Sequence, residues 1–303
     1  MNNFQLAPRY QLPKGGGFID PNLPNPHGPG DARIIIYGYT PNLTLCILAI
    51  ILFTLAFFAH LYQTLRYRLW SFIPLTVACL LETIGYIFRT LSSQKDPYRI
   101  SYFVVEYFLI VTAPVLISAS IYVCLTKIIA WAEPHGLRFG DGSRWCLRKR
   151  GILWFFISVD VFTTILQVTG AAMIGSKTSK QEDPTTANNI LLAGLAIQSF
   201  AFLIFLFLLS LTIFSILKDK EMKDELRRKR SPFLGVLIAS GLVFLRTVFR
   251  LVETSEGVFG YLSTHEAFFG SLEFAPVVVA VGLLGIWFPG RWPTREVGRR
   301  EKA

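Results

Sequence analysis

The sequence holds few of the residues that build metal centres or disulfide frameworks. It has four cysteines and four histidines among 303 residues. The cysteines show no paired spacing, and the histidines form no HExxH or other metal-ligating pattern. No strand and no Gly-Lys-Ser/Thr sequence follows Gly15-Gly16-Gly17, so this stretch does not resemble a phosphate-binding loop. We therefore expect no metal, no cofactor, no catalytic site and no direct use of ATP.

Charged residues are also scarce, at 17%, whereas hydrophobic residues make up 52% of the chain and occur in long blocks. Such blocks predict an all-α polytopic membrane protein with seven transmembrane helices. We place the spans at about 43–65, 70–90, 102–131, 151–174, 189–217, 233–253 and 268–289. Residues 1–40 lack the apolar segment of a signal peptide, so the first span is expected to direct insertion. The predicted organisation is a flexible tail (1–40), a seven-helix domain (41–290) and a basic tail (291–303).

The loops predict how the chain is oriented. Most of the 30 Lys and Arg residues lie in 66–69, 132–150, 218–232 and 291–303, which share one side of the predicted membrane. The positive-inside rule then places the N-terminus outside and the C-terminus in the cytosol. This topology explains the net charge of +10, so we predict no nucleic-acid partner. The segment 218–232 is a candidate site for a cytosolic partner, and Asn42-Leu43-Thr44 matches an N-glycosylation acceptor.

The sixth span carries charge inside an apolar run. Arg246, Arg250 and Glu253 are spaced i, i+4 and i+7, so on a helix they share one face. Charge within a span is costly unless it faces protein or water. The other intramembrane charges are Glu82, Arg89, Glu106, Asp160, Glu266 and Glu273. With the predicted topology, nearly all of them fall in the outer half, which predicts a polar cavity open to the outside and closed below by apolar packing.

Six acids accompany three arginines in this set, and the surplus of acid suits a lipid-like amine with a cationic head and an apolar tail. For each residue alone, packing between helices is the alternative explanation. The residues predicted to bind substrate are Glu82, Glu106, Asp160, Gln167, Gln198 and Glu273. The residues predicted to form a structural charge network are Arg89, Arg246, Arg250, Glu253 and Glu266, with Arg246 and Arg250 both holding Glu253.

Five short segments resemble the motifs of one family, in matching order and in matching spans. They are Glu82-Thr83-Ile84-Gly85-Tyr86-Ile87-Phe88-Arg89; Ala113-Pro114 with Ala119 and Tyr122; Asp160 with Gln167 and Gly170; Gly194-Leu195 with Gln198; and Arg246, Phe249-Arg250, Glu253, Gly257 and Gly260 with His265-Glu266. Over residues 37–289 the chain resembles the RTA-like family of fungal seven-helix membrane proteins, also called lipid-translocating exporters.

The resemblance implies a plasma-membrane protein, with other endomembranes possible, that exports sphingoid long-chain bases or related amphiphiles and confers resistance to toxic amphiphiles. Some members of the family are linked to other cargo, such as porphyrins. The chain departs from the family pattern at Glu106, where a Gln is expected, and at Gly270 and Glu273, where Tyr and Asp are expected. We expect these departures to alter the choice of cargo.

Two other functions are compatible with the residues. A seven-helix receptor for a lipid or stress ligand would also use an outward-facing pocket and basic cytosolic loops. An intramembrane enzyme is the weakest alternative, because no nucleophile–base pair or metal cluster has a recognisable spacing. We expect the protein not to be an enzyme and to take membrane lipid or an amphiphile as its substrate.

Overall fold

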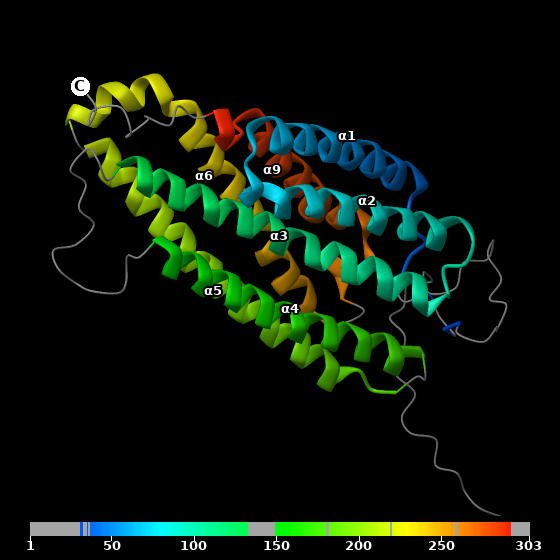
Figure 1. Ribbon diagram of the computed structural model, residues 1–303. Coiled ribbons are helices and arrows are strands. Elements are labelled where there is room, and N and C mark those ends of the chain that lie inside the picture. The colour runs from blue at the N-terminus through cyan, green and yellow to red at the C-terminus, as the bar shows by residue number, and fades with distance from the viewer. Residues whose placement is uncertain are drawn as a thin grey trace, which may run out of the picture.

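The computed structural model describes residues 31, 32, 35, 37–132, 149–179, 182–218, 220–257 and 260–291, which form an elongated bundle of long helices (Figure 1). The first six long helices are α1 (Leu43–Tyr67), α2 (Ile73–Gln94), α3 (Ile100–Ala132), α4 (Lys149–Ser179), α5 (Thr185–Lys218) and α6 (Lys220–Ser255). The last span runs through α8 (Glu266–Phe268), the π-helix η3 (Phe269–Phe274) and α9 (Ala275–Ile286). Short turns of helix lie at η1 (Trp70–Phe72), α7 (Tyr261–Thr264) and η4 (Pro289–Arg291).

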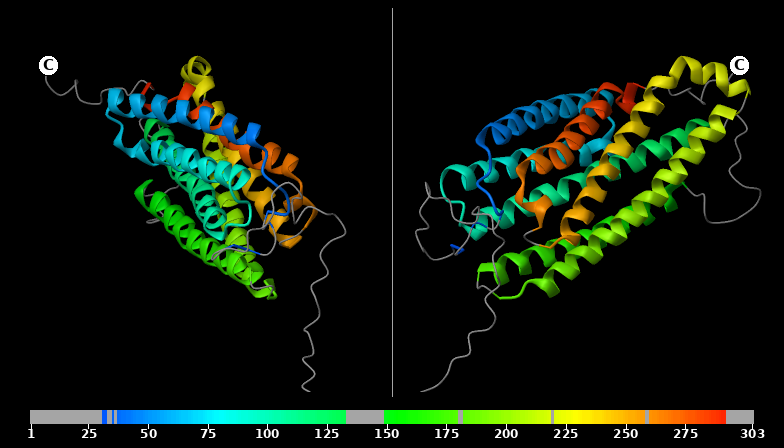
Figure 2. Two further views of the ribbon diagram at one scale, coloured as in Figure 1. Left: turned by 90° about the vertical axis from the view of Figure 1, so that its right-hand side faces the viewer. Right: turned by 180° about the vertical axis from the view of Figure 1, so that it is seen from behind.

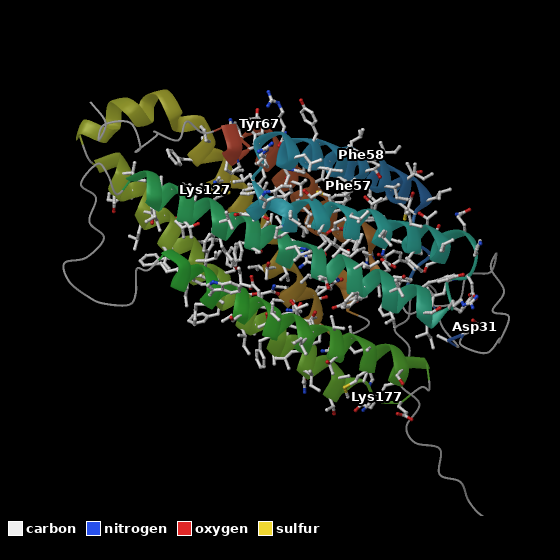
Figure 3. All side chains as sticks on the ribbon, in the orientation of Figure 1. Asp31, Phe57, Phe58, Tyr67, Lys127 and Lys177 are labelled. Carbon is white, nitrogen blue, oxygen red and sulfur yellow. The ribbon has the colours of Figure 1, made fainter. Side chains whose placement is uncertain are left out.

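The predicted class is confirmed, because within the described residues seven helices are long and apolar enough to cross a membrane, each within several residues of its predicted span. Large apolar side chains are exposed on the outside of the bundle, among them Phe200 and Phe214. Phe58 is another, and it is labelled in Figure 3. A surface of this kind is stable against hydrocarbon and not against water. The protein is therefore a multi-pass membrane protein. The predicted terminal tails fall largely on residues 1–30 and 292–303, which lie outside the described part of the chain.

Helices that follow one another in the chain pack side by side, and α9 closes the ring by contacting both α6 and α1 (Figure 2). Helix α3 also contacts α5 and α6, which places it at the centre. Its most apolar window is 72% buried, whereas the corresponding windows of α1 and α4 are each 22% buried. The most protein-enclosed environment in the bundle is thus around α3.

Both ends of α1 are fixed by local hydrogen bonds. The Asn42 side chain accepts from the backbone N–H of Thr44 at 2.8 Å, which is the usual N-cap interaction. At the other end Arg68 adopts a left-handed backbone (φ 50°), and the N–H groups of Arg68 and Leu69 donate to carbonyls of the last turn. These caps allow a turn of only two residues before η1 begins at Trp70.

Helices α4 and α5 approach closely at a pair of glycines. A Cβ at Gly170 would lie 2.8 Å from the backbone nitrogen of Leu191, and a Cβ at Gly194 would lie 3.1 Å from the carbonyl oxygen of Thr163. Beside this contact the Gln167 amide donates to the Gln198 carbonyl oxygen across the two helices at 2.7 Å. The close approach expected at Gly170 is therefore present, and it is typical of small residues in membrane helices.

Gly170→Ala is expected to destabilise the bundle by about 1–3 kcal/mol, because the added methyl group meets helix backbone that cannot move aside as a side chain can. The matched control is Gly241→Ala on α6, where a Cβ meets nothing within 4 Å and the alanine is the better helix former. Thermal unfolding of the purified protein in detergent should show a lower midpoint for Gly170→Ala only. Equal midpoints for the two variants would contradict the close contact.

Candidate binding cavity

Two clusters of buried charged side chains lie at one end of the bundle, called here the cavity end, where α1, α3 and α5 begin and α2, α4 and α6 end. Asp31 and Lys177 mark this end in Figure 3. The segment before α1 is held against it. The backbone N–H of Ala32 donates to the carbonyl of Tyr98 at 2.7 Å, and Asp31 forms an isolated antiparallel bridge with Arg99. This attachment brings Tyr37 and Tyr39 to the charged side chains of α2 and α3.

The first charged cluster is centred on Arg89, near the end of α2, which is only 2% exposed. Its guanidinium donates to Glu106 at 2.7 Å, to Glu266 at 3.3 Å and to the Tyr39 hydroxyl at 2.7 Å. The hydroxyl of Tyr37 donates to the second oxygen of Glu106. Because the partners come from α3, α8 and the segment before α1, this arginine holds three parts of the chain together at the cavity end. Glu82, seven residues earlier on the same helix, does not pair with Arg89.

The second cluster lies on α6 and the last span. Arg246 donates to Glu273 through Nε at 2.9 Å and through Nη2 at 2.5 Å. Arg250 contacts the other oxygen of Glu273 at 2.9 Å and donates to Glu253 at 3.0 Å. The prediction that both arginines hold Glu253 is thus right for Arg250, whereas Arg246 pairs with Glu273. Glu273 lies between the two guanidiniums across the helix interface, which makes it the nearer partner for Arg246.

The π-helix positions Glu273. It spans Phe269–Phe274 and ends just before Pro276, which has no N–H to donate to the carbonyl of Leu272. A missing donor of this kind favours a local widening of the helix, and π-segments commonly occur at functional sites. The same segment carries Phe269, whose ring centroid lies 4.0 Å from the Arg89 guanidinium and 5.9 Å from that of Arg250. One aromatic ring therefore separates the two clusters.

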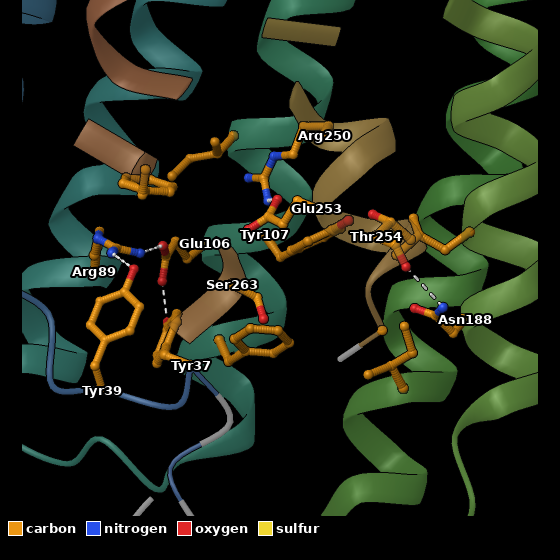
Figure 4. A pocket seen from close by; sticks show the side chains of 16 residues that line it. Tyr37, Tyr39, Arg89, Glu106, Tyr107, Asn188, Arg250, Glu253, Thr254 and Ser263 are labelled. Atoms are coloured by element: carbon orange, nitrogen blue, oxygen red, sulfur yellow. Dashed lines mark hydrogen bonds and ion pairs between the residues drawn. The ribbon is translucent and has the colours of Figure 1, made fainter. Parts of the chain in front are cut away.

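A cavity of about 120 Å³ lies between the two clusters (Figure 4). Its charged lining consists of Arg89 and Glu106 on one side and Arg250 and Glu253 on the other. The remaining lining residues are Tyr37, Tyr39, Phe103, Tyr107, Ile110, Ile174, Asn188, Leu191, Thr254, Gly257, Ser263 and Phe269. The site thus offers carboxylates, hydroxyls, an amide and aromatic faces within an apolar bundle, which suits a polar group carried on an apolar molecule.

Of the residues predicted to bind substrate, only Glu106 lines this cavity. Glu82 and Glu273 are buried beside it, and Glu82 is close enough to Glu273, Arg246 and Arg250 to interact with their charges. Asp160 accepts from the Tyr122 hydroxyl at 2.8 Å in an aromatic cluster that includes Phe205, away from the cavity lining. Gln167 and Gln198 bind each other where α4 and α5 cross. Among the residues assigned to the network, Arg89, Arg250 and Glu253 line the cavity.

Sequence reasoning missed Tyr37 and Tyr39, because the stretch before the first span shows no periodicity that places a side chain. Their hydroxyls remain donors at neutral pH. Burial raises the pKa of Tyr37 well above its ordinary value, with Glu106 adding to the shift, and burial raises the pKa of Tyr39 to about 12. The signal in the sequence was the aromatic pair itself, set just before a span boundary.

The two clusters hold more acid than base. Their carboxyl groups are Glu82, Glu106, Glu253, Glu266 and Glu273, and their guanidinium groups are Arg89, Arg246 and Arg250. Each arginine has a carboxylate partner, and among the described residues Glu82 is the carboxyl group of this set that forms no ion pair. A cation entering the cavity would reduce the cost of holding these carboxylates away from water.

Comparison with known proteins places these residues in a family. The sequence profile described as RTA1 like protein matches residues 75–296. The sphingoid long-chain base transporter RSB1 of Saccharomyces cerevisiae strain S288c is 27% identical, covering 88% of this chain and 77% of the relative. Protoporphyrin uptake protein 1 of the same strain is 25% identical, covering 83% of this chain and 91% of the relative. Protein RTM1 of Saccharomyces cerevisiae is 28% identical, covering 74% of this chain and 70% of the relative. No solved structure matches the chain.

Glu273→Gln is expected to destabilise the protein by about 3–5 kcal/mol, because it leaves Arg246 without its carboxylate and Arg250 with one of two in a buried setting. The matched control is Glu182→Gln, the same change at an exposed position between α4 and α5. Thermal unfolding in detergent measures both. If Glu273→Gln melts at the same temperature as Glu182→Gln, the buried pairs do not hold α6 to the last span.

Proposed function

Because this chain belongs to the RTA1-like family, we propose that it is a membrane transporter of amphiphiles whose cationic head occupies the cavity between Arg89 and Arg250. The proposed cargo is a sphingoid long-chain base or a related amphiphilic amine, and its export would protect the cell from toxic amphiphiles. The observation that carries the proposal is the excess of carboxyl groups around a cavity set in an apolar bundle. An ammonium head with hydroxyl groups matches its carboxylates, tyrosines and Asn188.

The proposal assigns a carboxylate to each side of the bound head. Glu106 and Glu253 both line the cavity, and each is held by an arginine that has a further carboxylate partner. Arg89 retains Glu266 and Arg250 retains Glu273 if the lining carboxylate turns toward a ligand. The lining acids can therefore bind a cation without leaving an arginine unpaired.

We place the cavity end on the extracellular side of the plasma membrane. The support is the positive-inside pattern, since the basic loops 66–69, 132–150 and 218–232 join helices at the opposite end. Helix α6 begins at Lys220, within the segment considered for a cytosolic partner, and the side chains of 217–231 lie outside the described part of the structure. An outward-facing cavity suits release of cargo from the outer leaflet.

Ligand sensing is a second candidate, favoured by one observation. Toward the opposite end, side chains of α3, α5, α6 and α9 pack into one continuous apolar cluster. This packing suits a receptor that holds its ligand at one face, and it equally suits a transporter in one state of its cycle. Replacing 218–232 by a neutral linker discriminates between the two. A transporter with intact topology should keep its efflux activity, whereas a receptor should lose its signal.

Glu253→Gln is expected to lower cellular efflux of a labelled sphingoid base by about tenfold or more at matched surface expression, because it removes a carboxylate from the cavity wall. The exposed Glu182→Gln is the matched control and should transport as wild type does. Wild-type cells that export no more base than cells lacking the protein would overturn the proposal for this cargo.

Asp160→Asn separates the cavity from the deeper aromatic cluster. The amide of the variant would still accept a hydrogen bond from Tyr122, and the position does not line the cavity, so efflux should stay within about twofold of wild type, a difference below 1 kcal/mol. Uptake of labelled protoporphyrin, an anionic cargo, is measured in the same cells. Efflux lost in Asp160→Asn but kept in Glu253→Gln would move the cation site from the cavity to α4.

A further inference from the structure

An apolar groove of about 180 Å³ adjoins the charged cavity on the outside of the bundle, between the start of α3 and the end of α4. The side chains that line only the groove are Val104, Val105, Phe108, Val168, Ala171 and Ala172. Ala172 is exposed, as is Phe108 at 45%. The groove therefore opens on the face of the bundle that contacts the hydrocarbon of the membrane.

The groove and the cavity share two side chains, Phe103 and Tyr107. The ring centroids of these residues are 5.9 Å apart. On the cavity side, Phe103 meets the ring of Tyr37 edge-on at 5.1 Å, and the guanidinium of Arg250 lies 5.5 Å from the ring of Tyr107. Two aromatic rings thus form the partition between the charged cavity and the apolar groove that opens to the membrane.

We infer that this groove holds the hydrocarbon chain of the amphiphile whose head lies in the cavity, so that cargo enters sideways from the membrane between α3 and α4. The inference rests on the proposed function, because it takes the cavity as the head-group site. Continuity through Phe103 and Tyr107 joins the two parts of one ligand, and the side chains that line only the groove are all apolar, which favours hydrocarbon. The small side chains of Ala171 and Ala172 leave the room that the chain fills.

Aromatic side chains suit the partition for a physical reason. Their faces attract the ammonium group by cation–π interaction, while their edges and bodies pack against methylene groups. A head passing between Phe103 and Tyr107 therefore exchanges hydrocarbon for aromatic faces before it reaches Glu106 and Glu253. The positions of Phe103 and Tyr107 set the length of hydrocarbon chain that the site accepts. With the head in the cavity, the chain must run past these two rings to reach the groove.

The first test fills the groove. Ala172→Phe places a large side chain at an exposed position, and Val161→Phe, also at an exposed position of α4 but outside the groove, is the matched control. Efflux is measured for a long-chain sphingoid base and for a short-chain amine with the same head. Ala172→Phe should lower long-chain efflux about tenfold, the cost of excluding about two methylene groups, and leave the short-chain cargo unchanged. Equal effects on both cargoes, or none, would overturn the inference.

The second test locates the chain directly. Purified protein in lipid nanodiscs is labelled with a sphingoid base that carries a photoreactive group in its tail, and adducts are mapped by mass spectrometry. Labelling should fall on 103–108 and 168–172, and Glu253→Gln should reduce it. A phosphatidylcholine probe with the same tail should label the groove less than the sphingoid-base probe does. Equal labelling would mean that the groove holds a bulk lipid chain only, which overturns the inference.

The two tests distinguish failure of this inference from failure of the proposed function. Adducts that depend on Glu253 but map elsewhere on the bundle would overturn the groove and keep the cavity. If the adducts do not depend on Glu253 and the wild-type protein also exports no base, both the groove and the proposed function would be overturned.

Discussion

The structure depends on the pairing of buried arginines with carboxylates inside an apolar bundle. In a hydrocarbon setting an unpaired guanidinium is costly, so Arg89, Arg246 and Arg250 must each find a partner on another part of the chain. Arg89 finds Glu106 on α3 and Glu266 at the start of the last span. Apolar packing brings the helices together but does not determine which helix faces meet. The ion pairs determine which faces meet.

The cavity follows from the same constraint. Two paired clusters, separated by the ring of Phe269, join α2, α3, α6 and the last span around the cavity at one end. The apolar cluster fills the bundle toward the other end. Because the carboxyl groups outnumber the guanidiniums, pairing is complete for the arginines and incomplete for the acids. On the proposed function, the arrangement is stable as a protein core and the lining carboxylates attract the cationic head, which is the combination that a transient binding site requires.

Much of the fold could be predicted from the sequence, because block hydrophobicity marks each span and the bilayer fixes its length. The shared face of Arg246, Arg250 and Glu253 followed from helical spacing alone. The choice of partner for Arg246 did not, because it depends on how α6 meets the last span and on a π-helix that no periodicity reveals. The separation of Asp160 and of the Gln167–Gln198 pair from the cavity also depends on packing, since depth along a span does not say which neighbour a side chain faces.

The most direct test of the central claim is equilibrium binding of a labelled sphingoid base to the purified protein in lipid nanodiscs, compared with an N-acylated analogue that has the same chain and no positive charge. The account predicts that the base binds at least about tenfold more tightly, that the difference shrinks in Glu253→Gln, and that Glu182→Gln keeps it. Equal binding of the charged and the uncharged ligand by the wild-type protein would contradict the claim that the carboxyl groups around the cavity select a cation.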